Sequence, residues 1–160
     1  MKFELTKVEE KDKNVIYNLM QIYSYELSFF EDETTNFTML DSGLYELKYI
    51  ERYWQEENRR PYILKCDNKL AGFVLQRYNE ENMNEIAEFF VINKYRKMGA
   101  GAFMARKMFE LYKGKWEVRT LLKNESAQKF WRNTIKEFAK NNFEEKFIKN
   151  NSRLAFYFES

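Results

Sequence analysis

The segment from residue 96 to residue 102 has the composition of a loop that binds an anion through its backbone. Its residues are Arg96, Lys97, Met98, Gly99, Ala100, Gly101 and Ala102. The two glycines allow a tight turn in which several N–H groups face one anion, and a helix starting there adds the positive end of its dipole. The Arg-Lys pair adds positive charge and the small alanines keep the approach open. The segment therefore predicts a pyrophosphate-binding loop, with glycines that only relieve a crowded turn as the alternative.

The rest of the composition excludes several kinds of catalytic, metal-binding and nucleotide-binding site. The chain has no His, which excludes His-based triads, His proton shuttles and the commonest zinc sites. Cys66 is the single cysteine, so no disulfide framework or Cys-rich metal cluster can form within the chain, and we expect no metal. The glycine segment also lacks the third glycine of a Rossmann loop and the Gly-Lys-Ser/Thr of a Walker loop. The lone thiol, the short apolar runs and the lack of a secretory signal predict a cytoplasmic protein.

Charge is distributed unevenly along the chain. Residues 1–60 contain 8 Lys/Arg and 13 Asp/Glu, whereas residues 61–160 contain 19 and 12. Scattered, solvated charge is the simplest interpretation. The alternative is a cationic partner near the first segment and an anionic partner near the second.

The length of 160 residues fits one domain, and we expect residues 1–160 to form it. Hydrophobic periodicity predicts, in order, a strand at 3–8, a helix capped by Asp12, a loop at 31–36, a helix at 43–56, strands at 62–65, 70–78 and 86–92, a helix from 99 to 114, a strand at 116–122, a helix over 127–138, and strands at 143–148 and 154–158. The three middle strands should form an antiparallel meander and the last two a hairpin. This order predicts a mixed α/β domain around one sheet.

The glycine segment also matches the motif Arg/Gln-x-x-Gly-x-Gly/Ala, preceded five residues earlier by a valine that ends a strand. The matching residues are Val91, Arg96, Gly99 and Gly101, with the hairpin and strand at 67–73 and the group Asn124, Ala127, Phe130 and Trp131 on either side. By these motifs and their order, the sequence resembles the GCN5-related N-acetyltransferase (GNAT) superfamily over nearly the whole chain. The resemblance implies the acyl-CoA N-acyltransferase fold, a mostly antiparallel sheet with helices on both faces, and acetyl coenzyme A (acetyl-CoA) as co-substrate.

The resemblance also implies the cofactor contacts. They are Phe90, Val91 and Ile92 along the pantetheine arm, Arg96 and the amides from Lys97 to Ala102 at the pyrophosphate, and Asn124 and Trp131. Pairing of the arm with a strand uses main-chain groups, so the side chains there can serve the core as well. Asn124 is equally suited to cap a helix, and Trp131 lies on an apolar stripe.

The implied reaction is direct attack of an amine on the thioester in a ternary complex, for which positioning can replace a protein nucleophile. The Val91 amide matches the donor to the developing oxyanion. Glu88 matches the acidic position that serves as general base, with Glu85 in reserve, and solvated edge charges are the alternative for both. The acceptor region lies over the first two helices, where Tyr23, Glu26 and Tyr45, within the acidic third of the chain, predict a small cationic amine.

One position departs from the family pattern. Seven residues after Asn124, where the family commonly has a Tyr that protonates the leaving thiolate, the chain has Trp131. An indole N–H has no useful acidity, so water, Tyr95 or Tyr112, or no acid at all must serve. The departure leaves open a second hypothesis, a catalytically silent acetyl-CoA sensor or interaction domain.

A third hypothesis, a basic aromatic patch for nucleic acid around residues 94–107, is opposed by the net charge of +2 and by the acidic third of the chain. We expect a small-molecule amine as partner, no nucleic acid, no membrane and, by family habit, a homodimer.

Overall fold

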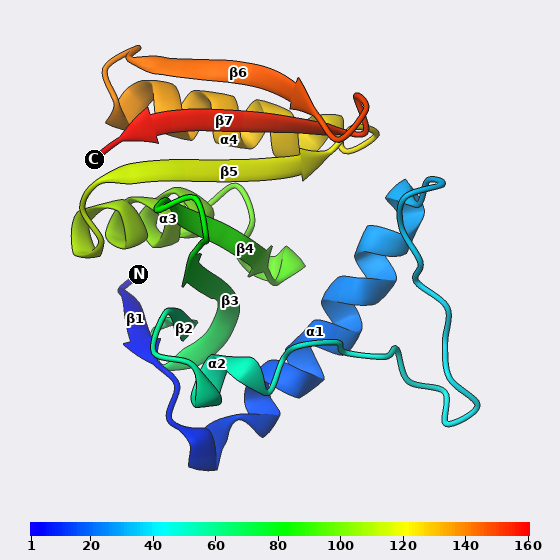
Figure 1. The fold of residues 1–160 in the computed structure, drawn as a ribbon. Helices are drawn as coiled ribbons and strands as arrows, with labels where there is room; N and C mark the ends of the chain where they lie inside the picture. Colours follow the sequence, from blue (N-terminus) through cyan, green and yellow to red (C-terminus); the bar gives the residue numbers. More distant parts are fainter.

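The computed structural model describes all residues from 1 to 160 and consists of one sheet with helices on both faces (Figure 1). The strands are β1 (Phe3–Lys7), β2 (Arg59–Cys66), β3 (Lys69–Tyr78), β4 (Asn84–Val91), β5 (Lys115–Leu121), β6 (Phe143–Ile148) and β7 (Arg153–Glu159). The helices are α1 (Asn14–Leu27), α2 (Arg52–Gln55), α3 (Ala100–Leu111) and α4 (Glu125–Phe138), with short 3-10 turns at Glu10–Asp12, Ser28–Phe30 and Asn93–Tyr95. The predicted mixed α/β class is confirmed.

The strand order is β1-β2-β3-β4-β5-β7-β6, and only β4 and β5 run parallel. The predicted meander of β2, β3 and β4 and the closing hairpin of β6 and β7 are both confirmed. The parallel pair is short, because β5 pairs with β4 only from Asn84 to Ile86. The second half of β4, from Ala87 to Val91, therefore has β3 on one side and no paired strand on the other.

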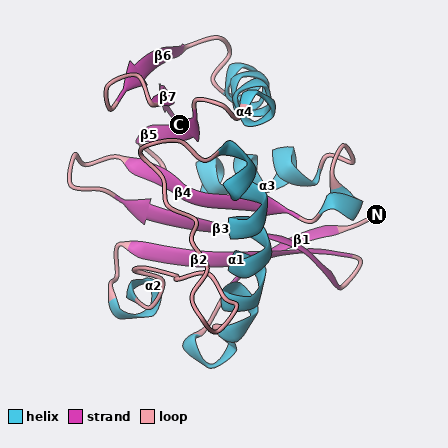
Figure 2. Ribbon diagram, turned by 90° about the vertical axis from the view of Figure 1, so that its right-hand side faces the viewer, coloured by secondary structure: helices cyan, strands magenta, loops and turns pink.

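Each face of the sheet has its own apolar core. On one face, α3 and α4 pack on β2–β5 and β7 through fully buried side chains such as Met104, Phe109, Trp116 and Phe156. On the other face, α1 and the region around α2 pack on β3 and β4, with Ile16 and Phe73 inaccessible to solvent. Figure 2 shows α1 crossing the sheet over β2, β3 and β4. None of the helices combines the length and apolar character that a membrane crossing requires.

Two predictions about the first third of the chain are wrong. The helix predicted at 43–56 is only one turn, Arg52–Gln55, because Gly43 and Tyr49 hold left-handed conformations that interrupt a helix. The apolar spacing there comes from separate turns, which bury Ile50 and leave Leu44 exposed. Asp12 lies within the 3-10 turn and does not cap α1, whose first turn has no side-chain cap.

Candidate active site

The loop between β4 and α3 presents a run of unbonded backbone N–H groups. The six amides from Lys97 to Ala102 donate to no acceptor in the chain, and the first helical bond runs from the Phe103 amide to the Gly99 carbonyl at 2.9 Å. Gly99 has φ +84°, the left-handed conformation that turns the loop into α3. Free donors at the positive end of a helix dipole suit a compact anion such as a diphosphate.

The two glycines of this loop differ in the space around them. An added Cβ at Gly99 would meet nothing within 4 Å, whereas one at Gly101 would lie 3.1 Å from two ring carbons of Phe130 in α4. Gly101 thus lets α3 approach α4. Relief of a crowded turn, the alternative to anion binding, therefore applies to Gly101 as well. A larger residue at 101 would have to displace Phe130 or turn toward the free amides.

Arg96 does not lend its charge to this loop. Its Nε donates to the Val91 carbonyl at 2.7 Å, and its two terminal nitrogens donate to both carboxylate oxygens of Glu26 at 2.5 and 2.6 Å. Its amide donates to the Asn93 carbonyl. Arg96 therefore ties the end of β4 to α1. The side chains of Arg96 and Glu26 are bonded to each other, and the cofactor contact of Arg96 and the acceptor contact of Glu26 stay predictions.

The unpaired half of β4 offers main-chain groups to a ligand. The Ile92 amide donates to the Ala71 carbonyl in β3, and Val91 stands opposite Gly72. Because successive residues of an antiparallel strand direct their N–H groups to opposite edges, the Val91 amide faces away from β3, toward the gap beside β5. Gly72 permits this packing, since a Cβ there would lie 2.2 Å from the Phe90 carbonyl oxygen.

A bulge in β4 decides which way Glu88 faces. The register passes from Leu75 opposite Glu88 to Gln76 opposite Ile86, which leaves Ala87 as the extra residue. Residues three apart on a regular strand lie on opposite faces, but one bulged residue restores the phase. Glu85 and Glu88 therefore share the face covered by α1.

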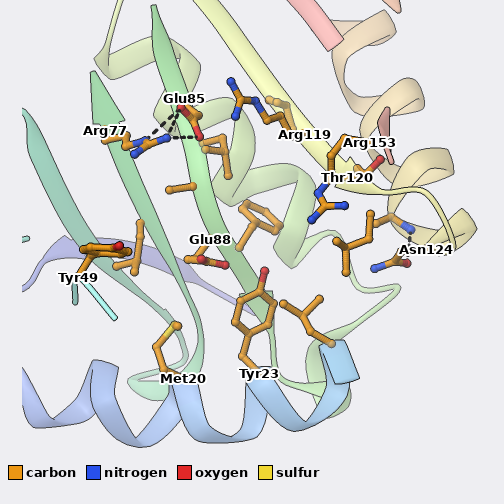
Figure 3. Close-up of a pocket in the computed structure, with 18 of the residues that line it drawn as sticks. Met20, Tyr23, Tyr49, Arg77, Glu85, Glu88, Arg119, Thr120, Asn124 and Arg153 are labelled. Atoms are coloured by element: carbon orange, nitrogen blue, oxygen red, sulfur yellow. Dashed lines mark hydrogen bonds and ion pairs between the residues drawn. The ribbon is translucent and has the colours of Figure 1, made fainter. Parts of the chain in front are cut away.

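Glu88 lies in an environment that suits a general base near neutral pH. The pKa of its carboxyl is raised to about 7: burial raises it most, the Tyr23 hydroxyl lowers it, the nearby Glu85 raises it and Arg77 lowers it. Tyr23 comes from α1 and points its hydroxyl toward Glu88 (Figure 3). The pKa of Tyr23 is raised well above its usual value, first by its own burial and then by Glu88. A carboxyl with this pKa can accept a proton from an ammonium and release it again at physiological pH.

The reserve candidate, Glu85, is already engaged. Both of its oxygens accept from the Arg77 guanidinium, from Nη2 at 3.0 Å and from Nε at 3.1 Å, and it is almost inaccessible to solvent. Its negative charge acts on Glu88. Glu88 is thus the carboxylate of the two that is not held by a guanidinium.

A cavity of about 480 Å³ opens beside Glu88, between α1, the loop after it, β4, β5 and the start of α4 (Figure 3). Tyr23, Glu88, Asn124 and Trp131 line it. Tyr45 does not, because its backbone N–H and carbonyl are bonded to the Gln21 side chain and its ring is buried. Phe90 is buried against α1 and also lies outside the lining.

Sequence reasoning missed several polar residues of this cavity, which come from late strands. They are Arg119 and Thr120 of β5 and Arg153 at the start of β7. A single charge beside an apolar strand is an ordinary pattern, so no local signal distinguished them.

Asn124 caps the start of α4, because its Oδ1 accepts a hydrogen bond from the Ala127 amide at 3.0 Å. This contact was one of the two roles considered for Asn124. Trp131 is buried in an aromatic cluster, edge-to-face with Phe89 at 4.7 Å and with Phe130 at 4.9 Å between ring centroids. Its position is that of a packing residue that also borders the cavity.

Neither tyrosine suggested as a substitute acid reaches the cavity. Tyr95 is buried in the core of the α3 face, and the Tyr112 hydroxyl is hydrogen-bonded to that of Tyr62 at 2.6 Å. The Tyr23 hydroxyl is directed at Glu88, and Tyr49 and Tyr53 also line the cavity.

The open β4 edge, the free amides before α3 and the adjoining cavity define an acyl-CoA-type transferase. Residues 20–134 match the model of the acetyltransferase (GNAT) family, and the chain belongs to this family. The predicted family and fold are thereby confirmed, and acetyl-CoA is the co-substrate that both the family and the free amides fit.

Solved structures show the same fold at low sequence identity. The PaiA N-acetyltransferase of Thermoplasma acidophilum in complex with coenzyme A has a TM-score of 0.68 at 13% identity, with 100% of both chains covered. The ribosomal-protein-S18-alanine N-acetyltransferase of Escherichia coli gives 0.63 at 12%, over 98% of this chain and 91% of that one. A spermidine N-acetyltransferase chimera from Vibrio cholerae SpeG and hSSAT gives 0.65 at 15%, over 99% and 96%. No curated protein sequence matches the chain.

Proposed function

We propose that this acetyltransferase moves an acetyl group from acetyl-CoA to a primary amine of a small molecule, by direct attack in a ternary complex. The observation that carries the proposal is the position of Glu88. Its carboxyl, with a pKa near 7, lines the cavity three residues before Val91, whose amide faces the open edge of β4. A base and an oxyanion donor are thus available on one stretch of strand.

Each part of the site has a role in the reaction. The amides from Lys97 to Ala102 would hold the pyrophosphate, and the open edge of β4 would align the pantetheine arm. The thioester supplies the acetyl group. Glu88 takes a proton from the incoming ammonium, directly or through water, so that its nitrogen can form the new bond to the carbonyl carbon as the carbon–sulfur bond breaks. The Val91 amide donates to the carbonyl oxygen as negative charge develops there.

The departing thiolate has no acid in the usual position. Trp131 cannot donate a useful proton, and Tyr95 and Tyr112 do not line the cavity, whereas Tyr23, Tyr49 and Tyr53 do. A thiolate of moderate basicity leaves without a proton, so Trp131 in place of the usual Tyr is compatible with turnover. The competing hypothesis of a catalytically silent cofactor-binding domain also rests on Trp131 in place of the usual Tyr.

The small cationic acceptor stays a prediction. Of Tyr23, Glu26 and Tyr45, on which it rested, only Tyr23 lines the cavity, where the acidic residues are Glu85 and Glu88. The acceptor's amine must still reach Glu88. A cytoplasmic location, a single domain and a homodimer remain predictions from sequence and family habit.

The test is release of coenzyme A thiol from acetyl-CoA with a panel of amines, beside thermal unfolding with acetyl-CoA alone. At a ligand concentration 100 times Kd, the cofactor should stabilise the fold by about 2.7 kcal/mol, or roughly 5 to 11 °C in Tm. Stabilisation with thiol release supports the enzyme. Stabilisation without turnover on any amine would favour the silent domain, and absence of both would contradict the proposal.

A further inference from the structure

The cavity beside Glu88 is lined by more basic than acidic side chains. Its acids are Glu85 and Glu88. Its basic residues are Lys48, Arg59, Arg77, Arg119, Lys149 and Arg153. Before the ion pairs of these groups are counted, such a lining disfavours a fully cationic acceptor and favours one that carries its own anionic group.

Most of these basic groups are engaged by acids of the same chain. Arg77 pairs with Glu85 at 3.0 Å, and Arg59 pairs with Glu56 at 2.7 Å. Arg119 lies against Glu117 in β5, at 2.5 Å, and Lys48 lies 3.7 Å from Glu46. Pairing of this kind balances much of their charge, although Lys149 pairs with no acid of the chain. Arg153 also has an acid, Asp32, within ion-pair distance, and it differs in that its Nε and Nη2 have no acceptor in the chain.

Arg153 holds one edge of its guanidinium free within the cavity. Its Nη1 donates to the Thr34 hydroxyl at 2.9 Å and to the Ser152 carbonyl at 2.8 Å, while its Nε and Nη2 donate to nothing in the chain. Its side chain is only 15% exposed. Figure 3 shows it reaching into the cavity from the β5–β7 side, across from Glu88 and Tyr23.

Asp32 does not occupy this free edge. Its carboxylate lies 3.6 Å from Nη1, beyond hydrogen-bond distance, and its Oδ1 accepts from the amide and the hydroxyl of Thr34. Asp32 thus partly balances the charge of Arg153 and fixes the loop. The Nε–Nη2 edge of a guanidinium is a fork that matches the two oxygens of a carboxylate.

We infer that the acceptor is an amino carboxylate, whose carboxylate binds the Nε–Nη2 edge of Arg153 while its ammonium meets Glu88. This inference rests on the proposed function and names its substrate class. Two opposite charges on the acceptor, matched by an arginine on one wall and a carboxylate on the other, orient the amine toward the Val91 edge. Arg153 is a specificity-determining residue that takes no part in proton transfer.

The test compares amino acids with their own carboxamides as acceptors, in the coenzyme A release assay. We expect the wild-type protein to prefer the acid of each pair at least tenfold in kcat/KM. In the variant Arg153→Met, KM for the acids should rise roughly 10- to 100-fold, as expected for loss of a charge-assisted bidentate contact, and KM for the carboxamides should stay unchanged. Equal use of acids and carboxamides by the wild type, or an equal loss for both in the variant, would overturn the inference.

Two further variants separate recognition from loop anchoring. Arg132→Met is the matched control, because Arg132 pairs with both oxygens of Glu145 outside the cavity, and it should keep the wild-type preference. Asp32→Asn removes the competing carboxylate and keeps the guanidinium, so KM for the acids should fall. A rise in KM with Asp32→Asn as large as that of Arg153→Met would show that the loop anchor matters instead, and would also overturn the inference.

The inference and the proposed function fail in different ways. Thiol release with carboxamides and acids alike would leave an N-acetyltransferase with no carboxylate recognition. No thiol release with any amine would remove the proposed function, and the inference with it.

Discussion

The loop proposed to hold the cofactor and the cavity proposed for the acceptor are built by opposite means. The loop uses the main chain of six consecutive residues, Lys97 to Ala102, and the donors from Gly99 onward are free because the first turn of a helix has no acceptors for them. The cavity uses side chains from α1, its following loop, β3, β4, β5, α4 and β7, drawn from residues 20 to 153. A main-chain site depends on local conformation, whereas a side-chain site depends on how distant elements pack. The loop should tolerate few changes of backbone conformation, whereas single side-chain substitutions should change the specificity of the cavity.

The largest effect is expected in the loop. Gly101→Glu should abolish acetyl-CoA binding, because its Cβ would be crowded by Phe130 and its carboxylate would compete for the free amides. The measurement is the acetyl-CoA-dependent shift in Tm, which should vanish. Gly101→Ala, which adds the crowding without the charge, should retain a reduced shift. Lys107→Glu, an exposed charge change further along α3, should bind like the wild type. Full binding by the glutamate variant would show that the loop does not hold the diphosphate.

The next effect concerns the base in the cavity. Glu88→Gln should lower kcat by about 10² to 10⁴ without changing acetyl-CoA binding. In the wild type, kcat/KM should fall as pH drops through about 7, where the raised pKa of Glu88 protonates the base. The variant should lack this midpoint. An unchanged pH profile in Glu88→Gln would assign the base elsewhere.

A milder change should move that midpoint. The Tyr23 hydroxyl lowers the pKa of Glu88, so Tyr23→Phe should shift the midpoint above 7 with a smaller loss of kcat.

The raised pKa of Glu88 also makes the stability of the fold depend on pH. The folded state binds the Glu88 proton more tightly than the unfolded chain does, so this group's contribution to stability is lost as pH rises from about 4.5 to about 7. Glu88→Gln should therefore stabilise the fold at pH 8 more than at low pH, as thermal unfolding would detect.

A smaller effect tests the link between the two regions. Arg96 joins α1 to β4 through Glu26, and both side chains are more than a third exposed. Arg96→Ala and Glu26→Ala should each cost about 1 kcal/mol, or roughly 2 to 4 °C in Tm, and the double variant should cost less than their sum. Kd for acetyl-CoA should stay within about threefold in all three. A selective loss of cofactor affinity in Arg96→Ala alone would restore the cofactor contact that the sequence predicted.

The smallest effect on catalysis is expected at Trp131. If no acid acts there, Trp131→Phe should change kcat by less than about threefold while lowering Tm, because the indole fills a buried aromatic cluster. Steady-state kinetics beside thermal unfolding separate the two. A loss of kcat above about tenfold, with the fold intact, would give the indole a direct role.

Most of the order of helices and strands, and the turn with free amides before α3, could be predicted from sequence because both depend on neighbouring residues. Hydrophobic periodicity marks elements directly, and a glycine that starts a helix exposes its amides whatever the rest of the fold does. The same reasoning failed at residues 43–56, where apolar residues at helical spacing belong to separate turns that only packing on α1 and β3 explains.

The chemistry of the cavity was decided by tertiary structure. The sequence could name Glu88 through a family resemblance, but the bulge at Ala87 turns it to the α1 face, and the burial there raises its pKa. The partners of charged groups are equally non-local: Arg96 and Glu26 are paired across seventy residues, and Arg153 meets Thr34 across more than a hundred. Main-chain donors follow from local conformation, whereas the protonation and pairing of side chains follow from neighbours that only the folded chain brings together.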